Sequence, residues 1–181
     1  EDCRKIDEEE GSYAGTLLRF VNAVAAEVEK HYPHVAVDTL AYRYTRRAPK
    51  LTKPRRNVII RLCSIECCFT HPLGTCSDVD PTDNPDSLQS TGGFVEDLEA
   101  WKKICDRIYV WDYLIDFPFS LLPYPNVEVL SPNVRFFTKN HVRGIFAQGG
   151  GHTRGTFAAE LKAYITAKCL WNPDCNAKAA V

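Results

Sequence analysis

Hydrophobic residues recur at two spacings along the chain, and the two spacings alternate. Between Gly15 and Tyr32 they recur about every three or four residues, which is typical of a helix with one buried face, and Pro33 ends the pattern. The next hydrophobic segment, residues 35–42, is short and rich in β-branched residues, which indicates a strand. The pattern therefore predicts a helix followed closely by a strand.

The same two patterns predict three more strands, each followed by a helix. The strands have runs of β-branched and aromatic residues, and we expect them at residues 57–64, 107–113 and 142–148. The helices have hydrophobic residues at helical spacing, and we expect them at residues 94–105, 129–140 and 156–170. Strands that alternate with helices in this way favour a parallel sheet with right-handed crossovers.

Three connecting segments stand out by composition. Residues 43–56 are basic and contain prolines, so we expect an exposed loop over one end of the sheet. Residues 71–93 are polar and too long for a simple connection. The glycines of residues 149–151 superficially resemble a phosphate-binding loop, but the lysine of that motif does not follow them, so we interpret this segment as a flexible turn.

These elements predict an α/β fold that corresponds to the C-terminal half of a TIM-type (β/α)8 barrel, with about four parallel strands and flanking helices. A complete barrel has about 250 residues and eight strands, so we predict that residues 1–181 form a single partial domain whose N-terminal strands lie outside this sequence. Half a barrel leaves the inner face and both edges of its sheet uncovered. We therefore expect this chain to pair with the N-terminal half of a barrel or to self-associate.

Charge and hydropathy argue against a nucleic-acid partner and against a membrane span. The 22 basic and 23 acidic residues are interleaved, so no broad electrostatic field favours nucleic acid or anionic lipid. Charged residues interrupt every hydrophobic stretch well before the roughly 20 residues that a membrane span needs. We therefore predict no nucleic-acid partner and no membrane span.

Eight cysteines, with a cluster at Cys63, Cys67, Cys68 and Cys76, leave three interpretations open. A zinc site usually has two close pairs of ligands, which the spacing C-x3-C-C-x7-C lacks. A disulfide between Cys68 and Cys76 would close a loop. We favour buried free thiols, so we expect no metal and no other cofactor, and cysteine usage leaves the redox compartment open.

Polar and aromatic residues gather where the predicted strands end. In a (β/α)8 barrel the chemistry lies at the C-terminal ends of the strands. Two carboxylates and several aromatic rings at one rim are typical of a sugar site, because glycoside hydrolysis uses carboxyl groups and aromatic faces stack on sugar rings. The candidate catalytic residues are Glu66 and Asp112, and the candidate substrate-binding residues are Tyr42, Tyr44, His71, Trp111, Tyr113 and Gln148.

Each of the polar candidates has a structural alternative. Glu66 lies among apolar and cysteine neighbours, where a carboxylate either serves the site or forms a salt bridge with Arg61 or another basic residue. Asp112 serves the site or caps a helix or loop. His71 bonds a sugar hydroxyl or caps the turn before Pro72.

The run Trp111-Asp112-Tyr113 poses a further question. Neighbouring residues on a regular strand point to opposite faces of the sheet. Either the carboxylate or the two rings must therefore belong to the core, unless the strand ends at Trp111.

Several sequence strings resemble a known bacterial family, domain of unknown function 4838, over nearly the whole chain. The strings that carry the resemblance are Arg61–Phe69 (RLCSIECCF), His71–Leu73 (HPL), Tyr109–Tyr113 (YVWDY), Glu160–Tyr164 (ELKAY) and Leu170–Asp174 (LWNPD). That family is similar to (β/α)8 glycosidases and includes glycoside hydrolase family 163, the endo-β-N-acetylglucosaminidases that cut the core of complex N-glycans. The resemblance implies an N-glycan substrate.

The resemblance also implies how the site is divided. Residues 3–7 resemble the end of a cysteine-bearing loop after the fourth strand, and related barrels carry an Asp-Glu pair at that strand, so this chain alone is expected to be inactive. Glu66 is expected to act as the acid or to orient the substrate's acetamide, with Asp112 supporting it. One departure is Ala147, where relatives have an acidic residue before Gln148, and it favours the alternative of a non-catalytic carbohydrate-binding protein.

Overall fold

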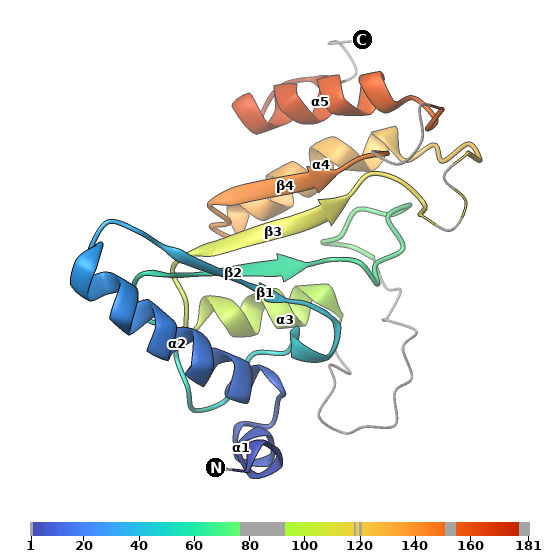
Figure 1. The fold of residues 1–181 in the computed structure, drawn as a ribbon. Coiled ribbons are helices and arrows are strands. Elements are labelled where there is room, and N and C mark those ends of the chain that lie inside the picture. The colour runs from blue at the N-terminus through green and yellow to red at the C-terminus, as the bar shows by residue number, and fades with distance from the viewer. Residues whose placement is uncertain (1, 77–92, 118, 120, 151–154, 178–181) are drawn as a thin grey trace.

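The computed structural model describes residues 2–76, 93–117, 119, 121–150 and 155–177. Four strands lie side by side and point in the same direction (Figure 1). They form one parallel sheet in the order β1-β2-β3-β4, which is also their order along the chain. Their bounds are Val37–Ala41 for β1, Val58–Cys63 for β2, Ile108–Tyr113 for β3 and Gly144–Gln148 for β4. This arrangement confirms the predicted α/β fold class and fits half of a (β/α)8 barrel.

Helices connect and flank the strands, close to where the hydrophobic spacing predicts them. Pro132 lies inside one of them, in its second turn, where it cannot donate the backbone hydrogen bond that another residue would form. The α-helices are α1 (Cys3–Glu10), α2 (Ala14–His31), α3 (Phe94–Lys102), α4 (Val127–Lys139) and α5 (Ala159–Trp171), and a 3-10 turn, η1, covers Arg43–Thr45.

Helix α1 corrects the expectation that residues 3–7 end a loop. Asp2 caps its first turn by accepting a hydrogen bond from the backbone N–H of Arg4. Gly11 closes it in the left-handed conformation, with φ of 63°, and its N–H bonds back to the last turn. The helix was missed because its sequence is mostly charged and carries a single buried apolar residue, Ile6.

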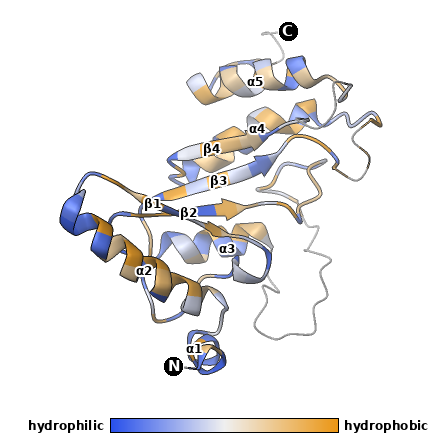
Figure 2. Cartoon of the chain, viewed as in Figure 1, coloured by the Kyte–Doolittle hydropathy of each residue, from blue (hydrophilic) through white to orange (hydrophobic). Residues whose placement is uncertain are grey.

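The helices pack on one face of the sheet and form its core. Side chains alternate along each strand, so Val58, Ile60 and Leu62 of β2 point the same way and are almost fully buried. They meet Leu18 of α2 and Leu98 of α3 in one hydrophobic cluster. Figure 2 shows hydrophobic and hydrophilic residues alternating along α2, as expected for a helix with one buried side.

The opposite face of the sheet is less covered by the described residues. Asp38, Leu40 and Phe146 on this face are exposed, and Arg61 and Trp111 are half-buried. In a closed barrel this face points inward. Here several of its side chains are exposed, so a ligand or a partner chain can reach this face of the sheet.

The basic segment after β1 was predicted to be an exposed loop, and this prediction is wrong for part of it. Thr45 and Arg46 are buried under the C-terminal end of the sheet. Glu10 of α1 is also fully buried, and its carboxylate accepts hydrogen bonds from the backbone N–H groups of Leu51 and Thr52. Polar contacts therefore hold this segment against the rest of the protein.

None of the helices in the described part of the chain has both the length and the hydrophobicity to cross a membrane. The sheet face that would point inward in a closed barrel is partly exposed, so we still expect it to pair with a partner.

We predict that the chain expressed by itself self-associates through this face. Replacing the exposed Phe146 by Gln should lower the tendency to associate, because it removes apolar surface that a second copy would cover. Phe20→Gln on the outer side of α2 removes an even more exposed ring and should change nothing. Sedimentation velocity over a range of concentrations measures the difference, and a wild-type chain that stays monomeric throughout would contradict the half-barrel account.

Candidate functional site

A cavity of about 350 Å³ lies at the C-terminal ends of the strands, on the open face of the sheet. All four strands or the residues directly after them contribute to it. Its lining is mostly aromatic or aliphatic, with one amide. The lining residues are Leu40, Tyr42, Cys63, Ile65, Trp111, Tyr113, Phe117 and Gln148.

Trp111 and Gln148 form the floor of this cavity. They lie on neighbouring strands, and the indole Nε1 donates a hydrogen bond of 2.7 Å to the Gln148 side-chain oxygen. The Trp111 ring also packs on Phe146 with ring centroids 4.6 Å apart. These contacts fix the plane of the indole and leave the Gln148 amide nitrogen as a potential donor to a ligand.

The question posed by Trp111-Asp112-Tyr113 is answered by strand alternation. Trp111 and Tyr113 both line the cavity, whereas Asp112 points to the helix-packed side of β3. The Tyr113 ring is held between Phe69 and Phe117, with centroids 5.7 Å and 5.6 Å away. Burial raises the pKa of Tyr113 well above its usual value, so its hydroxyl stays protonated and can donate a hydrogen bond.

Tyr44 lies outside this cavity. It lines an adjacent hollow of about 610 Å³ between the first two helices and β1, where its ring meets Tyr13 edge-on at 5.9 Å. Leu40 and Tyr42 line both spaces. Of the six residues predicted to bind substrate, the structure therefore brings four together in one cavity and places Tyr44 next to it.

Glu66 follows β2 and forms a buried ion pair with Arg46. The guanidinium Nη1 lies 2.7 Å from the Glu66 carboxylate, and the two side chains are 1% and 8% exposed. The partner is therefore not Arg61, which pairs with Asp38 on the open face of the sheet. Glu66 does not line the cavity, but its charge acts on Cys63 and Tyr113, which do.

Arg46 is one of two buried cations, among the described residues, that the sequence did not reveal. Its Nε donates a 2.7 Å hydrogen bond to Asp97 of α3, and its carbonyl accepts one of 2.7 Å from the indole of Trp101. Burial disfavours charge on Arg46, but the Asp97 hydrogen bond and the charge of Glu66 outweigh it, so the pKa of the guanidinium is raised. Nothing in the sequence distinguishes Arg46 from Arg47 beside it.

Asp112 is buried, and the Ser64 hydroxyl donates a 2.8 Å hydrogen bond to it. This bond joins the C-terminal ends of β2 and β3. Burial raises the pKa of Asp112 to about 6, although the hydrogen bonds from Ser64 and from the backbone of Tyr113 act in the opposite direction. The carboxyl group, which lies behind the cavity, therefore titrates at a mildly acidic pH.

His71 lies away from the cavity, in the loop that follows β2. Its Nδ1 is 3.3 Å from the sulfur of Cys68, and that sulfur is 3.3 Å from the sulfur of Cys76. The three ligand atoms lie within 4.8 Å of one another, so this group could hold a metal ion.

Lys162 of α5 is a second residue that the sequence did not reveal. It is 1% exposed, and its ammonium donates hydrogen bonds of 2.9 Å to the carbonyls of Leu114 and Tyr124. Burial lowers its pKa. Ala147 lines the same small space behind β4, so a larger residue at position 147 would point toward the helices and not into the cavity.

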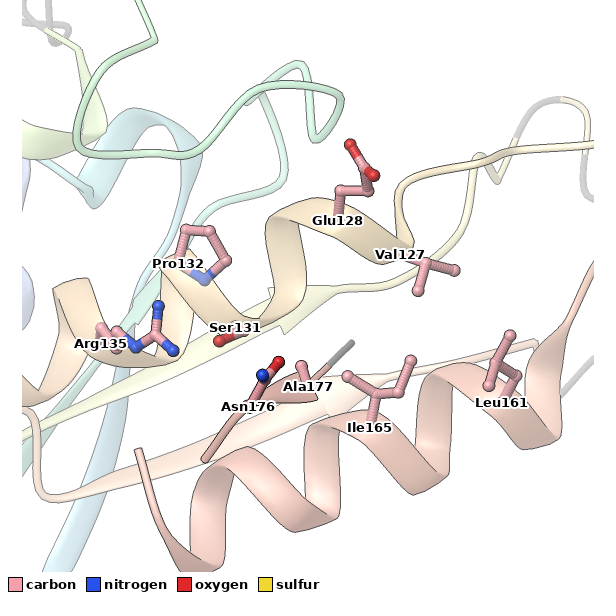
Figure 3. Close-up of a pocket in the computed structure, with 9 residues that line it drawn as sticks. All are labelled: Val127, Glu128, Ser131, Pro132, Arg135, Leu161, Ile165, Asn176 and Ala177. Atoms are coloured by element: carbon pink, nitrogen blue, oxygen red, sulfur yellow. The ribbon is translucent and has the colours of Figure 1, made fainter. Parts of the chain in front are cut away.

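A further hollow of about 510 Å³ lies between parts of α4 and α5 (Figure 3). The described residues that line it come from these two helices and residues 176–177, and none of them belongs to a strand. Arg135, the cation in its wall, donates hydrogen bonds to the carbonyls of Pro173 and Cys175 and so holds the C-terminal segment. We interpret this hollow as a packing gap between helices, because it contains none of the groups at the strand ends.

The family model for a domain of unknown function, DUF4838, matches residues 1–181. The chain belongs to this family. No curated protein matches the chain, and no solved structure matches it. In this DUF4838 chain, the cavity at the strand ends and the ion pair of Arg46 therefore have to be interpreted from their own geometry.

We predict that Arg46→Met lowers the free energy of unfolding by about 3–5 kcal/mol, because it leaves two buried carboxylates, Glu66 and Asp97, without their cation. Arg61→Met removes a more exposed ion pair with Asp38 and should cost at most about 1 kcal/mol. Urea unfolding of the two variants compares them directly. Equal losses would mean that the Arg46 network is not a structural centre.

Asp112 predicts a specific pH dependence of stability. Its pKa rises from an ordinary value of 3.8 to about 6 on folding, so between these values the folded chain holds a proton that the unfolded chain releases. The free energy of unfolding therefore falls as the pH rises through this window, by about 2–3 kcal/mol for this group.

Asp112→Asn keeps the acceptor for Ser64 and removes the titration. Subtracting its urea-unfolding curve from that of the wild type at each pH between about 4 and about 7 cancels the other groups. The difference should grow in favour of the variant as the pH rises. Parallel curves would show that the Asp112 carboxyl does not carry this dependence.

Proposed function

We propose that the cavity at the strand ends is one side of the carbohydrate site of a glycosidase-type (β/α)8 barrel. The observation that carries this proposal is the aromatic lining formed by Tyr42, Trp111 and Tyr113 around a polar amide, Gln148. Sugar rings offer apolar faces that stack on aromatic side chains and hydroxyl groups that need hydrogen-bond partners. The lining provides both kinds of contact.

The orientation of the rings supports a binding role over a core role. Trp111 is half-buried although it lies on a central strand, and two residues of β4 hold it: Gln148 by a hydrogen bond and Phe146 by a ring contact. A ring that is held in place but still accessible loses little entropy when a ligand stacks on it. This preorganisation favours recognition of a flat apolar face.

Glu66 is the carboxylate best placed to serve this cavity. It follows β2, lies directly after the lining residue Ile65 in the chain, and is held by the guanidinium of Arg46. A cation at 2.7 Å favours the ionised carboxylate. Of the two roles considered for Glu66, we therefore favour the one that needs a charged group, which orients the substrate's acetamide, over that of a proton donor.

Asp112 is a positioning residue in this scheme. It does not line the cavity, and it bonds the Ser64 hydroxyl that joins the ends of β2 and β3. Its neighbours Trp111 and Tyr113 are thereby held at a fixed level along the strand. The role expected of Asp112, support for the catalytic carboxylate, is thus proposed to operate through the backbone of the strand ends.

For the substrate we propose a β-linked N-acetylglucosamine in an N-glycan, cleaved with help from the substrate's own acetamide. The chain belongs to DUF4838. The resemblance of its sequence strings to endo-β-N-acetylglucosaminidases supports the choice of substrate. In such chemistry a carboxylate orients the acetamide and a separate carboxylic acid protonates the leaving group. The acid is expected in the part of the barrel that precedes these strands.

A second candidate is a non-catalytic carbohydrate-binding protein. The observation that favours it is that none of the described residues lining the cavity is acidic, while Glu66 is tied to Arg46. Binding of a sugar without turnover needs only the aromatic rings and the amide. The two candidates therefore share the cavity and differ in the function of Glu66.

We predict that the full-length protein that carries this chain releases N-glycans, and that Trp111→Ala and Glu66→Gln both lower release strongly. Trp111→Ala should weaken glycan binding at least tenfold, whereas Glu66→Gln should keep most of the binding and lose turnover by a factor of about 10² or more. Binding is measured by isothermal titration calorimetry, and release by mass spectrometry of the freed glycan.

Two control variants show whether the loss of any indole or of any carboxylate has these effects. Trp171→Ala removes an indole that is 92% exposed on α5, and Glu160→Gln neutralises an exposed carboxylate on the same helix. Both should leave binding and release unchanged. Tight binding without release by the wild type would favour the non-catalytic candidate, and unchanged release by Glu66→Gln would remove Glu66 from the mechanism.

A further inference from the structure

The loop after β2 brings together three side chains that the cavity does not use. The sulfur of Cys68 lies 3.3 Å from the sulfur of Cys76 and 3.3 Å from Nδ1 of His71, and the Cys76 sulfur lies 3.9 Å from the same nitrogen. These are three ligands of the two types, thiolate and imidazole, that zinc prefers, and they lie within one short loop.

The distances match those that a tetrahedral zinc ion imposes on its ligands. Bonds of about 2.3 Å to sulfur and about 2.1 Å to nitrogen, at tetrahedral angles, separate two sulfurs by about 3.8 Å and a sulfur from a nitrogen by about 3.6 Å. Each of the three distances differs from these values by about half an ångström or less. One ion can therefore contact Cys68, His71 and Cys76 with only small shifts of the side chains.

The backbone around these side chains is anchored from several sides. The Tyr124 hydroxyl donates a 2.6 Å hydrogen bond to the carbonyl of Cys68, and the N–H of Leu73 donates one of 2.8 Å to the side chain of Asn133. The N–H of Cys76 closes a turn onto the carbonyl of Pro72 at 2.9 Å. The loop is thus preorganised, so little ordering is needed when an ion binds.

We propose that Cys68, His71 and Cys76 bind a zinc ion that fixes this loop against the wall of the cavity. His71 is exposed and both cysteines are half-buried, so an ion can reach the group from solvent. The fourth position of the ion is left for a solvent molecule or another side chain. The link to the cavity is Phe69, which lies next to Cys68 in the chain and packs on Tyr113 at 5.7 Å.

A disulfide between Cys68 and Cys76 is the alternative to a zinc site. A disulfide needs the sulfurs about 2.05 Å apart and has no use for an imidazole. A zinc ion needs the imidazole and both thiolates. His71 is therefore the residue whose replacement separates the two interpretations.

Metal analysis of the purified chain tests the proposal. The chain is expressed with zinc in the medium, freed of loosely bound metal by dialysis and measured by inductively coupled plasma mass spectrometry. We expect about one zinc ion per chain. His71→Ala, Cys68→Ser and Cys76→Ser should each weaken zinc binding by more than the roughly 10- to 100-fold that loss of an outer partner costs. Cys105→Ser, which changes a half-buried thiol elsewhere, should keep the full zinc content.

Cobalt substitution gives a second measurement that does not depend on whether a variant folds. Cobalt in the wild-type chain should show the thiolate-to-metal charge-transfer absorption of a site with two sulfur ligands, and added zinc should remove it. Circular dichroism of each variant shows whether a loss of zinc comes with unfolding.

Three results would overturn the proposal. The first is a wild-type chain without zinc whose Cys68 and Cys76 are found joined as a disulfide by non-reducing peptide mapping. The second is a wild-type chain that holds neither zinc nor a disulfide after expression with zinc. The third is zinc that remains at the wild-type level in all three ligand variants. None of these results bears on sugar binding by the cavity.

Discussion

The alternation of side chains along four parallel strands is the constraint on which the rest of this structure depends. One set of residues points to the helices and forms the core, and the other set points to the open face. At the C-terminal ends of β2 and β3 this alternation separates residues that can contact a ligand from residues that hold them in place. It directs Trp111 and Tyr113 into the cavity and Asp112 into the protein behind it.

Buried polar contacts then fix the ends of the strands. Arg46 is hydrogen-bonded to Asp97 of α3 and paired with Glu66 after β2, so it joins a helix, a strand end and the segment after β1. The Ser64–Asp112 bond joins β2 to β3 at the same level. A buried ion pair gives little net stability compared with apolar packing, but it is costly to break, so it holds one arrangement in place. We interpret these two contacts as the reason that the aromatic rings keep a defined spacing.

Much of the fold was predictable from the sequence, because it depends on local spacing. In the part of the chain that the structure describes, the β-branched runs at β1 to β4 and the helical spacing of the longer helices located every strand and four of the five helices within a few residues. Helix α1 was not found, since a mostly charged segment shows no hydrophobic face even when a capping aspartate and a closing glycine stabilise it. The burial of Arg46 was also missed, because burial of one arginine among several depends on which carboxylates the fold brings near it.

The candidate site was predictable only in part, for the same reason. Strand ends locate Tyr42, Trp111, Tyr113 and Gln148, because a barrel places chemistry there, and all four line one cavity. Which partner holds Glu66, and that His71 lies with Cys68 and Cys76 and not with the rings, depends on loop conformation. Spacing along the chain argued against a metal site, whereas the folded loop brings the three ligand atoms together.

The central claim, that the aromatic cavity at the strand ends is a carbohydrate site, is tested most directly by a crystal structure of the full-length protein with an N-glycan bound. The account predicts a sugar ring stacked on Trp111 or Tyr113, with a hydroxyl group or acetamide bonded to Gln148. A glycan bound elsewhere, with the cavity at the strand ends filled by side chains from the rest of the protein, would contradict it.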